Sequence, residues 1–220
     1  MSDPADPRAR VLAYHRALSG WLTPAVAHLV SANEVDAVLA QARERFEDML
    51  DELPYVDRPG HAMYGSMFAC AAMLAVYEVL RERSIDAHTW GRAVHTLPPA
   101  VGEPDEAGRE RARLDGEASQ RAAAANEFVF EIVEGDGDSE RSMNITACAI
   151  CHLFGEHGAM DLVPYMCAYD DVVSDAGNQG LRRTGTIALG ASRCDFRFRD
   201  GGDPLRLAEA YPDRIRLGEP

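Results

Sequence analysis

The spacing of apolar residues changes once along this chain, and that change limits the folds that it can adopt. Between residues 11 and 95, apolar positions recur every three or four residues, which predicts amphipathic helices. At Phe128, Phe130 and Ile132 they alternate with the residues between them, which predicts a strand. We therefore expect an α+β fold, in which an N-terminal helical half packs on a small antiparallel sheet with a covering helix.

Further elements are expected from end signals and local pattern. Thr23-Pro24 predicts that one helix ends and another begins, because proline is favoured at the first helical position. Residues 63–82 are apolar on most sides and are expected to form the most buried helix. The remaining expected elements are a turn at 135–138, a helix at 143–157 stopped by Gly158, and strands at 181–190 and 194–199.

The length of 220 residues suits a single domain. We divide it into a helical half (1–100), a charged and partly helical linker (101–126), a sheet-containing half with the site (127–200) and a tail without a readable motif (201–220).

Charge and composition exclude several classes of function. The formal net charge of -14 argues against nucleic acid and against an anionic membrane surface as partners. All 22 basic residues are arginines, so neither a lysine Schiff base nor a phosphate-binding P-loop is possible. The N-terminus has no apolar run typical of a signal peptide, so we expect a cytoplasmic protein with reduced cysteines. A homodimer is compatible with the acidic helical sequence.

Four of the five cysteines fall between residues 148 and 194, and this clustering marks the candidate site. On the expected helix, Cys148 and His152 would share one face, because they are four residues apart. Together with Cys167 and Cys194 they have the ligand types of a zinc site, although the spacing differs from that of zinc fingers. One divalent metal therefore stands as an alternative to having no cofactor. The match of residues 148–152 to the haem-attachment motif Cys-x-x-Cys-His is interpreted as coincidence, since no export signal accompanies it.

Two other kinds of chemistry fit the same region. A cysteine with a lowered pKa and a nearby base can act as a nucleophile, whereas a buried free cysteine often serves as a small hydrophobe. An acid in an apolar stretch, such as Asp170, is a candidate general base. Strand alternation should send Cys194 and Asp195 to opposite faces of the sheet.

The ordered set of motifs in this region resembles the L-2-amino-thiazoline-4-carboxylic acid hydrolase family. The set begins at Cys148, continues with Cys167-Ala168-Tyr169-Asp170 and the run 183–190, and ends with Cys194-Asp195-Phe196. Leu53-Pro54-Tyr55 and the alanine-rich stretch 72–80 extend the likeness over nearly the whole chain. A looser likeness links the C-terminal part to the small-ligand-binding domain of the vinyl-reductase type.

The first resemblance implies hydrolysis of a small cyclic amidine, a C–N or C–S bond cleavage that opens a thiazoline ring to a carbamoyl amino acid. It implies a catalytic set of Cys194, Asp170, Cys167 and Cys148. Arg183, which could hold a substrate carboxylate, is expected to bind substrate with Thr186 and Asp195. The alternative is a non-catalytic small-ligand or metal-binding module, as the second likeness implies.

Overall fold

The structure, a computed structural model, describes residues 6–99, 106–133, 135 and 141–217. The chain divides into two compact units, residues 1–97 and residues 98–220. No helix among the described residues is both long and apolar enough to cross a membrane.

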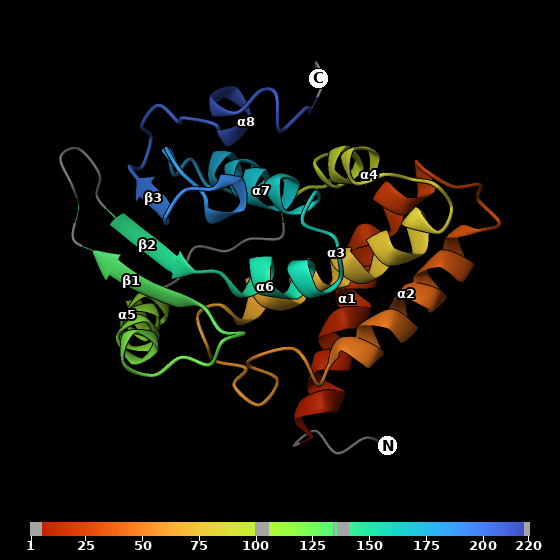
Figure 1. The fold of residues 1–220 in the computed structure, drawn as a ribbon, viewed down its shortest axis with the longest axis horizontal. Coiled ribbons are helices and arrows are strands. Elements are labelled where there is room, and N and C mark those ends of the chain that lie inside the picture. Colours follow the sequence, from red (N-terminus) through yellow and green to blue (C-terminus); the bar gives the residue numbers. More distant parts are fainter. Residues whose placement is uncertain (1–5, 100–105, 134, 136–140, 218–220) are drawn as a thin grey trace. The chain divides into compact units, whose positions relative to one another are not determined.

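The first unit consists of helices whose shared core is built around the third (Figure 1). This helix, α3, is apolar on most sides and almost fully buried, which confirms the prediction for residues 63–82. Trp90 is completely buried and donates a hydrogen bond from Nε1 to the carbonyl of Met73 at 3.1 Å. That bond joins two of the four helices, which are α1 (Pro7–Ala27), α2 (Val35–Met49), α3 (Tyr64–Arg81) and α4 (Ala87–Val94).

The predicted break at Thr23-Pro24 is wrong, because α1 continues through Pro24 to Ala27. Pro24 cannot donate a backbone hydrogen bond, but the Thr23 hydroxyl donates to the carbonyl of Ser19 at 2.9 Å. Leu22, Ala25 and Val26 are buried on either side of the proline. Burial of this apolar face favours a continuous helix over a restart.

The second unit is built on a three-stranded antiparallel sheet of order β1-β2-β3, which confirms the α+β class (Figure 1). Phe130 and Ile145 are buried on paired positions of the first two strands, and Cys194 begins the third. The elements in chain order are α5 (Glu106–Arg121), β1 (Val129–Val133), β2 (Arg141–Ala147), α6 (Ala149–Glu156), α7 (Val163–Ala176), the 3-10 helix η1 (Ile187–Leu189), β3 (Cys194–Phe198) and α8 (Leu207–Ala210).

Two expected elements of this unit are wrong. The helix predicted at 143–157 begins at Ala149, because the residues before it form β2. Met143 is paired with Ile132 on one side and with Phe196 on the other, so strand pairing outweighs the local helical pattern. The strand predicted at 181–190 is reduced to a bridge at Arg182, and η1 follows it.

The stretch predicted as a partly helical linker contains a regular helix that packs on the sheet. A Cβ at Gly116 of α5 would lie 3.2 Å from the carbonyl oxygen of Phe130, so the helix approaches β1 closely there. Ser119 and Gln120 also donate side-chain hydrogen bonds to that carbonyl. The turn predicted at 135–138 falls, apart from Gly135, outside the described residues.

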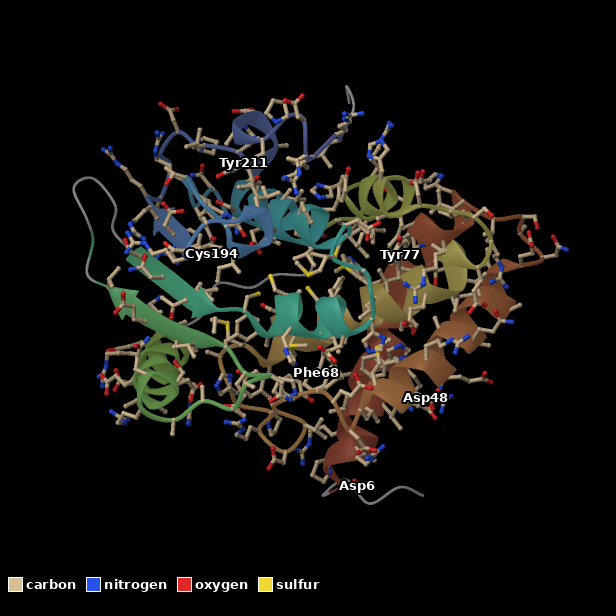
Figure 2. The ribbon with its side chains drawn as sticks, viewed as in Figure 1. Asp6, Asp48, Phe68, Tyr77, Cys194 and Tyr211 are labelled. Atoms are coloured by element: carbon tan, nitrogen blue, oxygen red, sulfur yellow. The ribbon has the colours of Figure 1, made fainter. Side chains whose placement is uncertain are left out.

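The segment after β3 binds the part of the unit that carries the candidate residues. Leu205 donates a backbone hydrogen bond to Leu181 at 2.9 Å. The Tyr211 hydroxyl, labelled in Figure 2, donates to the carbonyl of Thr184 at 2.9 Å. This tail has no motif that is readable from sequence, yet its backbone and side chains hold the 181–184 segment in place.

Candidate active site

Cys148 lies at the start of α6 and not within a helix as predicted. It is the N-cap residue, with an extended backbone, and its Sγ accepts a hydrogen bond from the backbone N–H of Cys151 at 3.4 Å. His152 lies on the first turn of the helix and its side chain is exposed. The His152 backbone N–H donates to the Cys148 carbonyl at 3.1 Å, but the imidazole is exposed whereas Cys148 is half-buried.

Cys167 and Cys194 are joined through the hydroxyl of Thr186. Cys167 comes from α7 and Cys194 from the first position of β3, labelled in Figure 2. The Thr186 Oγ1 atom lies 3.3 Å from each Sγ atom, and Thr186 has no exposed surface. The backbone N–H of Ile187 also donates to the Cys194 Sγ at 3.3 Å. The structure thus brings together two predicted cysteines and the predicted threonine.

Three of the four thiols of this region, those of Cys148, Cys167 and Cys194, favour the protonated form. Burial raises the pKa of Cys167 to about 12, and burial also raises the pKa of Cys194. A hydrogen bond with Cys151, assisted by burial, raises the pKa of Cys148 well above its ordinary value. Cys148 lies in the same part of the unit, because it directly follows β2, whose Ile145 is paired with Cys194. Near neutral pH these sulfurs are thiols and not thiolates.

Asp170 and Arg183 form an ion pair beside the thiols. Arg183 Nη1 donates to Asp170 Oδ2 at 2.9 Å, and Arg183 Nη2 donates to the carbonyl of Cys167. The guanidinium carbon also lies 4.6 Å from the centre of the Phe196 ring, within the range of a cation–π contact. The Arg183 side chain is 1% exposed whereas that of Asp170 is 46% exposed. The pair therefore consists of a half-exposed carboxylate that is hydrogen-bonded to a buried guanidinium.

Burial raises the pKa of Asp170, and the adjacent Arg183 guanidinium opposes part of that rise. The carboxylate is thus surrounded by protein but accessible to a small molecule. The predicted role of Arg183 was to bind a substrate carboxylate. In the structure both of its terminal nitrogens already bond protein groups, which makes it a support for Asp170.

The part of the chain that holds this cluster matches a known protein family. The model of the L-2-amino-thiazoline-4-carboxylic acid hydrolase family matches residues 66–198, which is more than half of the 220 residues. The chain belongs to this family. The matched range includes every residue of the cluster, from Cys148 to Phe196. Neither the curated proteins nor the solved structures gave a match to the chain.

In this member of the hydrolase family, Asp195 fixes the loop that carries Thr186. Its Oδ1 atom accepts backbone hydrogen bonds from Thr184 at 3.0 Å and from Gly185 at 2.7 Å. Its Oδ2 atom accepts one from the Thr184 hydroxyl. Cys194 is buried and Asp195 is half-buried, and the two side chains bond different groups. Substrate binding by Asp195 stays a prediction, whereas its hold on the loop is a structural fact.

Asp171, the neighbour of Asp170, is a buried acid of this family member. Burial raises its pKa to about 6, and its Oδ2 atom accepts a hydrogen bond from the backbone N–H of Leu207 at 2.7 Å. Its other oxygen is buried without a hydrogen-bond partner in the described part of the chain, as is the Nε atom of Arg183. The link to Leu207 could not be read from sequence, because the tail carries no spacing signal toward residue 171.

Within the described ranges, no three His, Cys, Asp or Glu side chains are arranged so that they could hold a metal ion. The ligand set expected from sequence was Cys148, His152, Cys167 and Cys194, and His152 is exposed on the first turn of α6. Metal binding by this hydrolase-family member stays a prediction.

Proposed function

We propose that the chain hydrolyses a small cyclic amidine such as the L-2-amino-thiazoline-4-carboxylic acid for which its family is named, and that it opens the ring to a carbamoyl amino acid. The observation that carries the proposal is the accessible carboxylate of Asp170, held by the buried guanidinium of Arg183 beside a group of protonated thiols. An amidine is a cation near neutral pH, and a half-exposed carboxylate is a suitable partner for it.

The reaction needs a base for the attacking water, a group that holds the amidinium and a proton donor for the departing atom. Water adds to the ring carbon between the nitrogen and the second heteroatom, and a base removes its proton. The tetrahedral carbon then re-forms a C=O bond while its ring bond to the heteroatom breaks, and the departing atom takes up a proton. In a thiazoline the departing atom is sulfur when the C–S bond breaks, and the product is then a carbamoyl amino acid with a free thiol.

We assign Asp170 as the base for the water and as the group that holds the amidinium. Its half-exposed carboxylate can hold the amidinium and can accept the proton of the attacking water. A base whose pKa is raised by burial is better matched to neutral pH than an ordinary aspartate. Arg183 acts as a positioning residue, since its hydrogen bond to Asp170 Oδ2 leaves Oδ1 for the substrate or the water.

We assign the thiols as the source of the proton for the departing atom. Their raised pKa values keep Cys167 and Cys194 protonated, which makes them poor nucleophiles and leaves each with a proton that the departing atom can take up. Thr186 bonds both sulfurs and so positions the two thiols. We assign Cys148 to the same group of thiols. Thr186 has no exposed surface, so we assign it to orientation of the thiols and not to direct substrate contact.

This scheme uses no cofactor, and metal analysis tests that part of it. Elemental analysis of the purified protein should show no stoichiometric zinc, iron or manganese, and activity should survive dialysis against a chelator. About one metal equivalent per chain, with activity lost on its removal, would select a metal-assisted mechanism instead.

The function itself is tested with L-2-amino-thiazoline-4-carboxylic acid in water enriched in oxygen-18. Mass spectrometry should find one heavy oxygen in the carbamoyl group of the product, since the attacking water supplies that atom. A thiol reagent should report one new thiol per turnover if the C–S bond breaks. Tight retention of unchanged substrate, without product, would instead favour a non-catalytic ligand-binding module.

A further inference from the structure

The Cys148-Ala149-Ile150-Cys151 stretch occupies a special place in the fold, and the proposed reaction leaves Cys151 without a role. Cys148 is the N-cap of α6, and Cys151 is the third residue of that helix. Both side chains are half-buried and free. Residues three apart inside a regular helix have Cβ atoms about 5–6 Å apart, which exceeds the roughly 3.5–4.5 Å that a disulfide needs.

The N-cap position changes that geometry. The backbone of Cys148 is extended, with φ of -115° and ψ of 110°, and its side chain folds back over the first turn. The Cys148 Sγ atom thereby lies 3.4 Å from the backbone nitrogen of Cys151. The side chain of Cys151 is also the largest cause of the raised pKa of Cys148, as expected for a group close to that thiol. The two sulfurs are thus neighbours in the folded chain.

We propose that Cys148 and Cys151 are a reversible dithiol–disulfide pair, and that formation of the disulfide removes the Cys148 thiol from the site and suppresses hydrolysis. The first part stands on the geometry of α6. The second part rests on the proposed function, because it requires Cys148 to serve the hydrolase site.

The oxidant for this step is a small disulfide. The thiolate of Cys151 attacks one of its sulfur atoms, which forms a mixed disulfide and releases one small thiolate. The sulfur of Cys148 loses its proton and attacks the Cys151 sulfur, which closes the Cys148–Cys151 bond and releases the second small thiolate. The two cysteines give up two electrons, and their two protons end on the two released small thiols.

Cys148 connects this pair to the catalytic group. Cys148 directly follows β2, and Ile145 of that strand is paired with Cys194 at the start of β3. In the disulfide that sulfur carries no proton and is drawn toward the first turn of α6. Cys151 is outside the Thr186-centred hydrogen bonds of Cys167 and Cys194. Cys151 would therefore react first with the oxidant, and the site would lose the thiol of Cys148.

Peptide mapping tests the pair directly. The folded, full-length protein is incubated with oxidised glutathione, its remaining thiols are blocked, and it is digested after arginine and glutamate. Cleavage after Arg141 and after Glu156 isolates a peptide that contains Cys148 and Cys151 but neither Cys167 nor Cys194. We expect this peptide to lose the mass of two hydrogens and to regain it on reduction with dithiothreitol. Two thiols that stay blocked and unlinked, or a disulfide that joins Cys167 to Cys194, would overturn the proposal.

Activity measurements then test the consequence. Wild-type protein should lose most of its hydrolase activity as the disulfide forms and regain it on reduction. Cys151→Ser should keep the activity of reduced wild type and resist the oxidant, whereas the control Cys70→Ala, in the other unit, should stay sensitive. A thermal melt confirms that both variants fold. A full disulfide without loss of activity would overturn the regulatory part. An inactive reduced protein that still forms the disulfide would refute the hydrolase function and leave the dithiol pair standing.

Discussion

Arg183 and Asp170 form an ion pair whose two members differ sharply in exposure: the guanidinium is 1% exposed and the carboxylate is 46% exposed. A carboxylate turned toward solvent can exchange its neighbours for water or substrate, whereas the buried cation depends on its protein partners. The pair is therefore asymmetric in stability as well as in function, and the substitutions below use that asymmetry.

Asp170→Ala should destabilise the protein more than Arg183→Met does. Without Asp170 the buried guanidinium loses its counter-ion, and because the carboxylate is half-exposed we expect a cost below the roughly 3–5 kcal/mol found for fully buried pairs. Without Arg183 the half-exposed carboxylate can be hydrated, and methionine fills much of the same space. Urea denaturation of both variants measures the difference in the free energy of unfolding. Equal losses would show that the exposure difference has no energetic consequence.

Thr186→Val should reduce turnover with little effect on substrate binding. Valine has nearly the shape of threonine but cannot bond the Cys167 and Cys194 sulfurs, which lie 3.3 Å from the hydroxyl. We expect stability to fall by about 1 kcal/mol, as for one buried hydrogen bond. Steady-state kinetics should show a lower kcat at unchanged KM, and Thr186→Ser should recover most of the activity. A change in KM alone would place Thr186 at the substrate instead.

Asp171→Asn should change how stability depends on pH. Burial raises the pKa of Asp171 from 3.8 to about 6, so the folded protein holds this proton more tightly than the unfolded chain. The stabilising contribution is complete below pH 3.8 and is lost as the pH rises through 6, a loss of about 3 kcal/mol. Unfolding followed from pH 4 to 7 should show the asparagine variant gaining stability relative to wild type. A constant difference across that range would contradict the burial of an ionisable Asp171.

His15→Gln should act in the opposite direction. Burial of the imidazole, which stacks on Phe46 with ring centres 4.1 Å apart, lowers its pKa from 6.5 to about 4, and Arg43 adds to the shift. The unfolded chain then binds the proton more readily, so stability is present above pH 6.5 and is lost as the pH falls through 4. The full loss is about 3 kcal/mol.

The His15→Gln variant should lack this acid-dependent loss of stability. Its unfolding free energy, measured against wild type between pH 4 and 7, should rise relative to wild type as the pH falls. A parallel acid loss in both proteins would show that other groups control it.

The sequence predicted elements where the burial pattern was strong and local. The all-round apolar α3, the alternation of β1 and the strand at Cys194 are of this kind. The prediction of secondary structure was wrong where a pairing partner distant in sequence decides the conformation. Met143 belongs to a strand because Ile132 and Phe196 pair with it on both sides. The same pairing moved Cys148 from the interior of a helix to its N-cap.

The candidate site was likewise predictable from sequence only in part. The motifs located the cysteines, Asp170 and Arg183, but residue types alone could not show that Arg183 is enclosed by Asp170, the Cys167 carbonyl and the Phe196 ring. Nor could they show that the Thr186 hydroxyl lies between two sulfurs from different elements. These relations depend on how α7 meets the loop before β3, which no local pattern encodes.

The most direct test compares Asp170→Asn with Asp175→Asn in the ring-opening assay. Both acids lie on α7 and pair with an arginine, but Asp175 forms its ion pair with Arg206 at 2.8 Å and has no contact with the thiol group in the described structure. Asparagine keeps an acceptor for Arg183, so both variants should fold. Asp170→Asn should lower kcat/KM by about 100-fold or more, as expected for loss of a general base, while Asp175→Asn stays near wild type. Equal activity in the two variants, with both melting like wild type, would contradict a site centred on Asp170.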